Sequence, residues 1–242
     1  MMNNIKNIIK KMVSIEILKF PRNLVGHVIS NIISIRNGVA IYYNDPERSK
    51  VITLIKKIKS ENEMLLTNNE AYQIYMVVKR TEKIKGDIAE VGVYKGGSAK
   101  LICEAKGNKN LHLFDTFEGL PDLCPMDDSK QFHLGEYSAS IESVKYYLRE
   151  YPHVSIYKGI FPKTAKSIKN KKFSFVHLDL DLYEATLNSI KYFYPIMNKG
   201  GIIISHDYTI APGVKKAFDD FFKDKLEPII EMSGTQCLVI KL

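Results

Sequence analysis

The sequence predicts an α/β fold in which a doubly wound, mostly parallel sheet of seven strands follows a helical N-terminal extension. From residue 86 onward, short apolar runs alternate with segments that repeat apolar residues at helical spacing. The last two apolar runs have no helix between them, which predicts an antiparallel pair at one edge of the sheet. Before residue 60 the pattern is helical and basic.

The alternation assigns each element of the sheet and its covering layers. Strands are expected over residues 87–93, 111–115, 154–158, 173–179, 201–205, 226–230 and 236–242. Helices are expected over residues 96–106, 141–151, 183–197 and 213–222. Ligands of such sheets bind at the carboxyl ends of the strands. The segment from Thr116 to about Ser140 is long for a connection at that edge, and long loops there often act as lids.

Length and composition are those of one globular domain with an addition. The chain has 242 residues, 45% of them hydrophobic, and a mean hydropathy of −0.15. It contains no apolar run of about 18 residues and no signal-like start, so neither a membrane span nor a secretory signal is expected. Cys103, Cys124 and Cys237 are odd in number and lack C-x-x-C spacing, which argues against a disulfide framework and a cysteine zinc site. A reducing cytoplasm is the expected location.

The positive charge is confined to the N-terminal extension, which we assign to residues 1–60, with the main domain over 61–242. Residues 1–60 hold eleven Lys or Arg and three Asp or Glu, which accounts for the whole net charge of +8. The rest of the chain is balanced, so a uniformly basic surface for nucleic acid is not predicted. Three stretches, 5–20, 23–35 and 51–60, repeat apolar residues at helical spacing. They predict a helical cap or a homo-oligomer contact, or alternatively peripheral attachment to an anionic membrane surface.

A glycine-rich loop, EVGVYKGGSA over residues 90–99, connects the first strand of the main domain to its helix. We expect Gly92 to allow the turn, and Gly96 and Gly97 to let the backbone approach a ligand at the helix N-terminus. Ser98 is a candidate cap of that helix. The spacing is G-x-x-x-G-G rather than the dinucleotide pattern G-x-G-x-x-G, which favours S-adenosylmethionine over NAD.

Asp115 ends the second strand, about 20 residues after the glycines. A carboxylate there is placed to accept both hydroxyls of a ribose, which NAD and S-adenosylmethionine share. The alternative is an N-cap, but the following FEGLP does not resemble a helix start. In KGIFPKT, residues 158–164, Gly159 marks a turn near the expected adenine.

Carboxylates follow the two central strands of the predicted sheet. Asp179 and Asp181 end the stretch FSFVHLDLD, and SHDY places His206 and Asp207 at the next strand end. If strand geometry persists, Asp179 and Asp181 point to the same side, and all four side chains converge. Unpaired like charges would repel there, and a divalent cation bound by oxygen ligands, best Mg²⁺, would relieve the conflict. For Asp181 alone, the simpler interpretation is a helix N-cap.

These motifs resemble the macrocin-type O-methyltransferases. The resemblance rests on EVGVYKGGSA, LFDTFEGLP, KGIFPKT, HLDLDLYEATLNSIKYFYPIMNKGG and SHDYTIAPGVKKAFDDF, and it covers about residues 65–242. The stretch TNNEAYQIYMVVKRT resembles the helix that lies over the cofactor in that family. The resemblance implies a Rossmann-like methyltransferase sheet, S-adenosylmethionine as cofactor, metal assistance, and methylation of a sugar hydroxyl.

The resemblance also implies roles for the strand-end residues. Asp179 and Asp207 would bind Mg²⁺ or another divalent metal, and Asp181 would be the general base. The family has two consecutive aspartates at the last position, whereas this chain has His206 before Asp207. Imidazole suits Mn²⁺, Fe²⁺ or Zn²⁺ better than Mg²⁺. His206 is therefore expected to be a metal ligand or a second catalytic base, unless the metal keeps fewer protein ligands.

Contacts with the cofactor are expected from Glu90, Gly92, Tyr94, Gly96, Gly97, Ser98, Asp115, Thr116, Gly159, Phe161 and Asp179. His112, His133, His153 and His177 are expected to be structural or surface residues.

The expected reaction is methyl transfer to a hydroxyl oxygen of a small-molecule diol. Two vicinal hydroxyls on one metal ion would orient one of them toward the methyl group, which favours a sugar acceptor. Three alternatives stay open: a catechol-type phenolic O-methyltransferase, an NAD-dependent oxidoreductase, and a non-catalytic S-adenosylmethionine-binding partner protein.

Overall fold

A computed structural model describes residues 33–36, 39–42 and 45–242 of the chain. The chain divides into two compact units, Met1–Thr53 and Leu54–Leu242, and each is described by itself. The division falls within helix α3 (Pro46–Glu61), whereas the sequence places the domain boundary between residues 60 and 61.

The first unit contains a short antiparallel pair, β1 (Ile33–Arg36) and β2 (Val39–Tyr42). The predicted helix over 23–35 is therefore wrong at its end, where Ile33 and Ile35 belong to β1. The missed signal is the Asn-Gly sequence at 37–38, a pair typical of two-residue hairpin connections. Helix α3 confirms the helix predicted over 51–60. The predicted helix over 5–20, most of that over 23–35, and the membrane or oligomer contact assigned to them lie outside the described residues.

The second unit is built on a seven-stranded sheet with the order β5-β4-β3-β6-β7-β9-β8. Its strands are β3 (Asp87–Val91), β4 (Leu111–Asp115), β5 (Val154–Lys158), β6 (Phe173–Leu178), β7 (Met197–Ser205), β8 (Ile230–Glu231) and β9 (Cys237–Ile240). The five neighbouring strands β5, β4, β3, β6 and β7 are parallel to one another. Strand β9 is antiparallel to β7, and β8 is antiparallel to β9. This arrangement confirms the predicted mostly parallel sheet with an antiparallel pair at one edge. The strand predicted over 226–230 is wrong in its bounds, because β8 shares only Ile230 with it.

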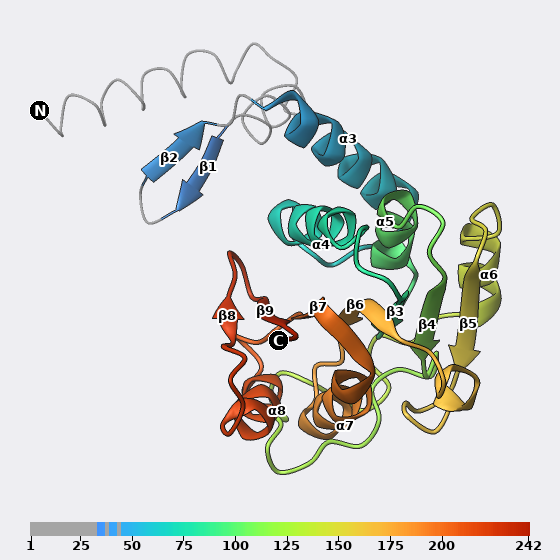
Figure 1. Cartoon of the computed structure of the whole chain (residues 1–242), viewed down its shortest axis with the longest axis vertical. Helices are drawn as coiled ribbons and strands as arrows, with labels where there is room; N and C mark the ends of the chain where they lie inside the picture. The colour runs from blue at the N-terminus through green and yellow to red at the C-terminus, as the bar shows by residue number, and fades with distance from the viewer. Residues whose placement is uncertain (1–32, 37–38, 43–44) are drawn as a thin grey trace, which may run out of the picture. The chain divides into compact units, whose positions relative to one another are not determined.

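Helices cover both faces of the sheet (Figure 1). The α-helices are α4 (Asn68–Arg80), α5 (Gly97–Ala105), α6 (Ile141–Tyr147), α7 (Tyr183–Phe193) and α8 (Pro212–Phe222). Two 3₁₀ turns, η1 (Ala165–Ile168) and η2 (Tyr194–Ile196), complete the unit. Helices α4 and α5 lie on one face, and α7 and α8 lie on the other. Helix α7 ends before the predicted residue 197, because Pro195 in η2 cannot continue the α-helical hydrogen bonding.

No helix among the described residues is long and apolar enough to cross a membrane.

An aromatic cluster packs α7 against the sheet and against the residues that follow β5. The ring of Phe193, on α7, stacks on Phe161 with centroids 5.1 Å apart and planes 4° apart. It also meets the ring of Phe173, on β6, edge to face at 5.0 Å. Phe193 and Phe173 are completely buried, and Phe161 lies after β5, toward the edge where ligands of this fold bind. The cluster therefore connects the amino end of β6, through α7, to the residues that follow β5.

We expect Phe193→Ala to lower the free energy of unfolding by about 3–5 kcal/mol, because it leaves a cavity among three packed rings. Chemical denaturation monitored by circular dichroism measures the change. The matched control is Leu226→Ala, since the Leu226 side chain is 88% exposed and should cost less than about 0.5 kcal/mol. Equal effects of the two substitutions would contradict the packing role of Phe193.

Candidate active site

A cavity of about 310 Å³ lies at the carboxyl ends of the parallel strands. This volume is at the lower end of the range for small-molecule sites. Twelve of the predicted site residues line it: Gly92, Tyr94, Gly97, Ser98, Asp115, Thr116, Gly159, Phe161, Asp179, Asp181, His206 and Asp207. Glu90 and Gly96 do not belong to its lining. The residues that the sequence spreads over more than a hundred positions thus surround one space.

Gly92 joins the glycine-rich loop to the end of β6. Its φ is +88°, and a Cβ atom at this position would lie 1.7 Å from the carbonyl oxygen of Asp179. The N–H of Gly92 donates to the carbonyl oxygen of Phe114 at 2.9 Å, and that of Asp179 donates to Val91 at 2.9 Å. Only glycine satisfies both the backbone angle and the close contact, so the loop and Asp179 are positioned together.

Gly96 and Gly97 also lie close to protein side chains. A Cβ atom on Gly97 would lie 2.6 Å from Cβ of Met64, and one on Gly96 would lie 3.2 Å from Cγ1 of Val144. Gly97 lines the cavity at the start of α5. The approach of a ligand to their backbone stays a prediction.

The sequence predicted that Ser98 caps α5, and this prediction is wrong. Helix α5 begins at Gly97, so its N-cap is Gly96, which has no side chain to make a capping bond. Ser98 is buried in the first turn of α5, where it belongs to the cavity lining.

Glu90 lies beneath the glycine-rich loop and is paired with His177 across strands β3 and β6. Both side chains are fully buried, and Nδ1 of His177 lies 2.8 Å from Oε1 of Glu90. Burial raises the pKa of Glu90, although the bond with His177 opposes this shift. Glu90 thus supports the loop from below, and a direct contact with a cofactor, which the sequence predicted, has no support in its position. His177, expected to be structural, is part of the sheet interior.

Asp115 holds the glycine-rich loop with its side chain. Oδ2 accepts hydrogen bonds from the N–H groups of Val93, at 2.7 Å, and Tyr94, at 2.9 Å, and Oδ1 accepts from Phe117 at 2.6 Å. No helix follows Asp115, so the N-cap alternative is wrong. A carboxylate has roughly four acceptor positions, which leaves about one for a ribose hydroxyl rather than the two predicted.

The long loop after β4 is closed on itself at one place and tied to α7 at another. The backbone N–H of Leu120 donates to the carbonyl oxygen of Glu136 at 2.8 Å, and the carbonyl oxygen of Leu120 accepts from the N–H of Gly135 at 2.9 Å. Asp127 accepts from the N–H of Tyr183 at 2.7 Å, at the start of α7. The loop has no helix or strand, yet its Phe132 and Tyr137 form part of the cavity wall. Sequence reasoning missed Asp127, whose partner is 56 residues away.

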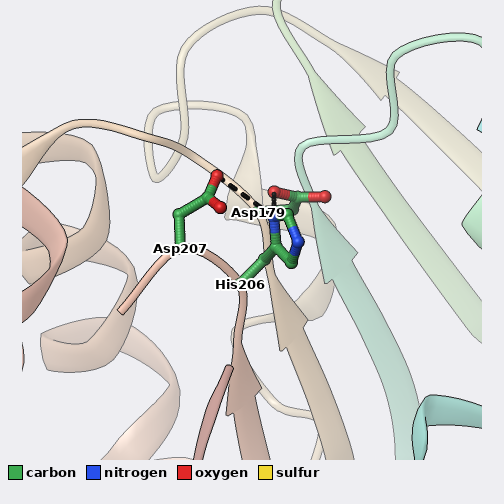
Figure 2. Close-up of side chains that lie close together, drawn as sticks. All are labelled: Asp179, His206 and Asp207. Carbon is green, nitrogen blue, oxygen red and sulfur yellow. Dashed lines mark ion pairs between the residues drawn. The ribbon is translucent and has the colours of Figure 1, made fainter. Parts of the chain in front are cut away.

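Asp179, His206 and Asp207 form the polar centre of the cavity (Figure 2). Nδ1 of His206 lies 3.2 Å from Oδ1 of Asp179 and 3.1 Å from Oδ2 of Asp207. The register of β6 and β7, which pairs Leu178 with Ser205, brings the residues that follow these strands side by side. Potential ligand atoms of the three side chains lie within 4.8 Å of one another. The predicted convergence of these three residues therefore occurs.

A third carboxylate, Glu70 on α4, approaches the other side of the His206 ring. Its Oε2 lies 3.7 Å from Nε2 of His206. Glu70 is 2% exposed and accepts hydrogen bonds at 2.8 Å from the N–H groups of Thr67 and Thr235. The sequence signal for Glu70 is the capping box T-x-x-E at residues 67–70, which identifies a helix start but not a neighbour of His206.

These carboxylates hold a proton on the His206 ring. Burial opposes a charge there, but Asp179, Asp207 and Glu70 together raise the pKa of His206 far above its ordinary value. Burial likewise opposes the charge on Glu70, while the nearby His206 ring and the hydrogen bonds from Thr235 and Thr67 lower the pKa of Glu70. In this state, His206 is the cation of a buried network of carboxylates.

Asp181 reaches the cluster by a backbone turn and not by the alternation of a strand. Strand β6 ends at Leu178, and Asp181 has a φ of +63°. Asp181 is not the N-cap of α7, since that position is Leu182. Burial, the charge of Asp179 and a hydrogen bond with Asp207 all raise the pKa of Asp181. This environment makes the Asp181 carboxylate more basic than that of an ordinary aspartate.

Comparison with known proteins identifies a family over most of the second unit. The family described as macrocin-O-methyltransferase (TylF) matches residues 69–237. A 28% identical relative from Streptomyces olivaceus, 8-demethyl-8-(2,3-dimethoxy-alpha-L-rhamnosyl)-tetracenomycin-C 4'-O-methyltransferase, aligns over 63% of this chain and 64% of its own length. Demethyldecarbamoylnovobiocin O-methyltransferase of Streptomyces niveus is 27% identical over 57% of this chain and 58% of its own length. The chain thus spans less than two thirds of the length of these relatives.

The fold is shared with a solved structure. The O-methyltransferase NovP superposes with a TM-score of 0.66, covering 80% of this chain and 99% of that chain at 21% identity. This likeness agrees with the strand order and the antiparallel edge pair described above.

We expect Gly92→Ala to destabilise the protein and to abolish binding of S-adenosylhomocysteine, since the added methyl group would overlap the backbone of Asp179. The control is Gly107→Ala, which also has a positive φ, +59°, but has no atom within 4 Å of the added Cβ. Only the left-handed strain of about 1–2 kcal/mol should remain in the control. Denaturation curves and titration calorimetry measure both properties. A Gly92→Ala protein that matched the control in both would contradict the coupling of loop and strand end.

Proposed function

Because the chain belongs to the macrocin-O-methyltransferase family, we propose that it methylates a hydroxyl group of a sugar or glycosylated small molecule, with S-adenosylmethionine as methyl donor. The observation that carries this proposal is the meeting of a glycine-rich loop and a carboxylate cluster on the wall of one cavity. In the reaction, the hydroxyl oxygen gains the methyl carbon while the sulfonium S–C bond breaks, and the hydroxyl proton passes to the protein.

The cavity wall after β3, β4 and β5 suits the cofactor. Gly92 and Tyr94 line it at the loop, Asp115 retains acceptor capacity for a ribose hydroxyl, and Gly159 and Phe161 lie after β5. When bound, S-adenosylmethionine would supply an activated methyl group. The task of these residues is to hold the cofactor beside the end of β6, where Asp179 and Asp181 follow.

The cluster at the ends of β6 and β7 suits a divalent cation. The separations of 3.1 and 3.2 Å from Nδ1 of His206 are close to those between neighbouring ligands of an ion bound at about 2.1 Å. Glu70, on the second ring nitrogen, matches the carboxylate that commonly orients a metal-binding histidine. Asp179, His206 and Asp207 would hold the ion, which would lower the pKa of a coordinated hydroxyl. The imidazole favours Mn²⁺, Fe²⁺ or Zn²⁺ over Mg²⁺.

Asp181 is the residue best placed to take the hydroxyl proton. Burial and the neighbouring carboxylates raise the pKa of Asp181, which makes its carboxylate a stronger base than that of an ordinary aspartate. A base with a raised pKa holds the transferred proton more firmly. Asp179 and Asp207 already contact His206, and with it they would hold the metal ion that orients the hydroxyl group.

Metal removal tests the role of the cluster. We expect complete chelation to abolish methyl transfer to a sugar diol, and Mn²⁺ to restore it at lower concentration than Mg²⁺, since an imidazole is among the ligands. His206→Asp should reverse or narrow the preference for Mn²⁺ over Mg²⁺, because all protein ligands of the ion would then be oxygen atoms. Mass spectrometry of the acceptor and calorimetric metal titration measure the two effects. Full activity without any metal would contradict the assignment.

Asp181→Asn tests the proton acceptor. We expect it to lower kcat at least a hundredfold while leaving the affinity for S-adenosylhomocysteine within about threefold, because an amide is isosteric but cannot take the proton. Asp224→Asn is the matched control, since the Asp224 side chain is 84% exposed and lies outside the cavity lining. Turnover of Asp181→Asn equal to that of the control would exclude Asp181 as the base.

A further inference from the structure

Asp207 has a backbone conformation that the surrounding structure must hold in place. Its φ is +58°, in the left-handed region that residues other than glycine rarely adopt. The carbonyl oxygen of Asp207 accepts hydrogen bonds from the N–H groups of Ile210, at 3.2 Å, and Ala211, at 2.8 Å. These bonds close the turn that connects β7 to α8, and Ala211 is the N-cap of α8. The position of the Asp207 carboxylate therefore depends on how this turn is attached to α8.

Tyr208, the residue after Asp207, attaches the turn to α8. Its side chain is 4% exposed, and its ring meets that of Phe218 edge to face with centroids 5.9 Å apart. The Tyr208 hydroxyl donates to Oδ1 of Asp219 at 3.0 Å and accepts from Nζ of Lys215 at 2.9 Å. Lys215 and Asp219 are themselves ion-paired at 3.3 Å. One helix thus fixes both the ring and the hydroxyl of this buried tyrosine.

The same helix makes a similar set of contacts with a second tyrosine, Tyr183 at the start of α7. The Tyr183 hydroxyl donates to Oδ2 of Asp220 at 2.9 Å, and Asp220 is ion-paired with Lys216 at 2.9 Å. This ion pair lies one residue further along α8 than the pair that holds Tyr208. Tyr183 is only partly buried, so water competes for its contacts, and its hydroxyl fixes the backbone less firmly than that of Tyr208.

We infer that Tyr208 is a positioning residue that holds the Asp207 carboxylate against His206 by anchoring the turn to α8. Oδ2 of Asp207 lies 3.1 Å from Nδ1 of His206 (Figure 2), a hydrogen-bonding distance that a displacement of about 0.5 Å would lose. Tyr208 does not belong to the cavity lining, so its effect passes through Asp207. The inference rests on the proposed function where Asp207 is a metal ligand, but the contact with His206 can be measured without a metal ion.

Two neighbouring substitutions on α8 test the inference. Asp219→Ala and Asp220→Ala each remove one partly exposed carboxylate, one ion pair with a lysine four residues earlier and one bond from a tyrosine hydroxyl. Only Asp219→Ala releases the hydroxyl of Tyr208. The readout is nitrogen-15 NMR of the histidine rings in the full chain without added metal, and the loss of signals in His206→Asp identifies those of His206.

We expect Asp219→Ala to shift the ring-nitrogen signals of His206 and Asp220→Ala to leave them in place. The signals of His112, which pairs with Asp87 at the first residue of β3, should stay unchanged in both variants. Unshifted His206 signals in Asp219→Ala would overturn the inference. Equal shifts in the two variants would also overturn it, because they would show a general effect of α8 rather than an effect of Tyr208.

Tyr208→Phe removes the hydroxyl and keeps the ring that packs on Phe218. We expect it to shift the His206 signals and to weaken Mn²⁺ binding about tenfold in calorimetry, without changing the affinity for S-adenosylhomocysteine. Tyr183→Phe is the matched control, since it removes a hydroxyl that bonds to the same helix, and it should change none of these properties. Unshifted His206 signals in Tyr208→Phe would contradict the inference. An unsubstituted chain that bound no Mn²⁺ would overturn the proposed metal site alone, because the His206 signals are read without a metal ion.

Discussion

The contact between Gly92 and the backbone of Asp179 is the constraint on which the candidate site depends. A Cβ atom at residue 92 would lie 1.7 Å from the carbonyl oxygen of Asp179, so the loop that follows β3 and the turn that follows β6 fit together only through a glycine. Asp115 reinforces the arrangement, because its carboxylate accepts hydrogen bonds from the two residues after Gly92. The proposed cofactor region and the polar centre are therefore parts of one rigid edge of the sheet.

Charge is the second organising feature of the site. His206 lies between Asp179 and Asp207 on one side of its ring and Glu70 on the other, and these carboxylates outweigh the burial that would otherwise lower its pKa. A proton on Nδ1 and the proposed divalent cation would each satisfy the same two aspartates. A cation bound by Nδ1 would therefore require that His206 lose that proton, which would link metal affinity to the network that includes Glu70. Helix α4 thus takes part in the polar centre from outside the sheet.

The sequence by itself determined the layers of the fold and the mostly parallel pairing of the sheet. Alternating strands and helices specify a parallel sheet, and the shared edge of parallel strands brings Asp179, His206 and Asp207 together whatever the details of the turns. The position of Asp115 at the ligand-binding edge was also predictable, because the apolar run before it defines where the strand ends. Errors occurred where a local pattern has two structural meanings, as in residues 33–35, whose apolar spacing suits a helix but which pair as a strand.

Only the tertiary structure decided which side chain meets which across long separations in the chain. Glu70 reads as a helix-capping residue, Asp127 as a loop residue and Glu90 as a cofactor contact, but their partners are His206, the start of α7 and His177. Nor does the sequence show that the closest neighbours of Gly96 and Gly97 are Val144 and Met64. Periodicity records which face of an element is buried, because burial repeats with the element. The identity of a contact depends on how separate elements pack, and no local pattern encodes that.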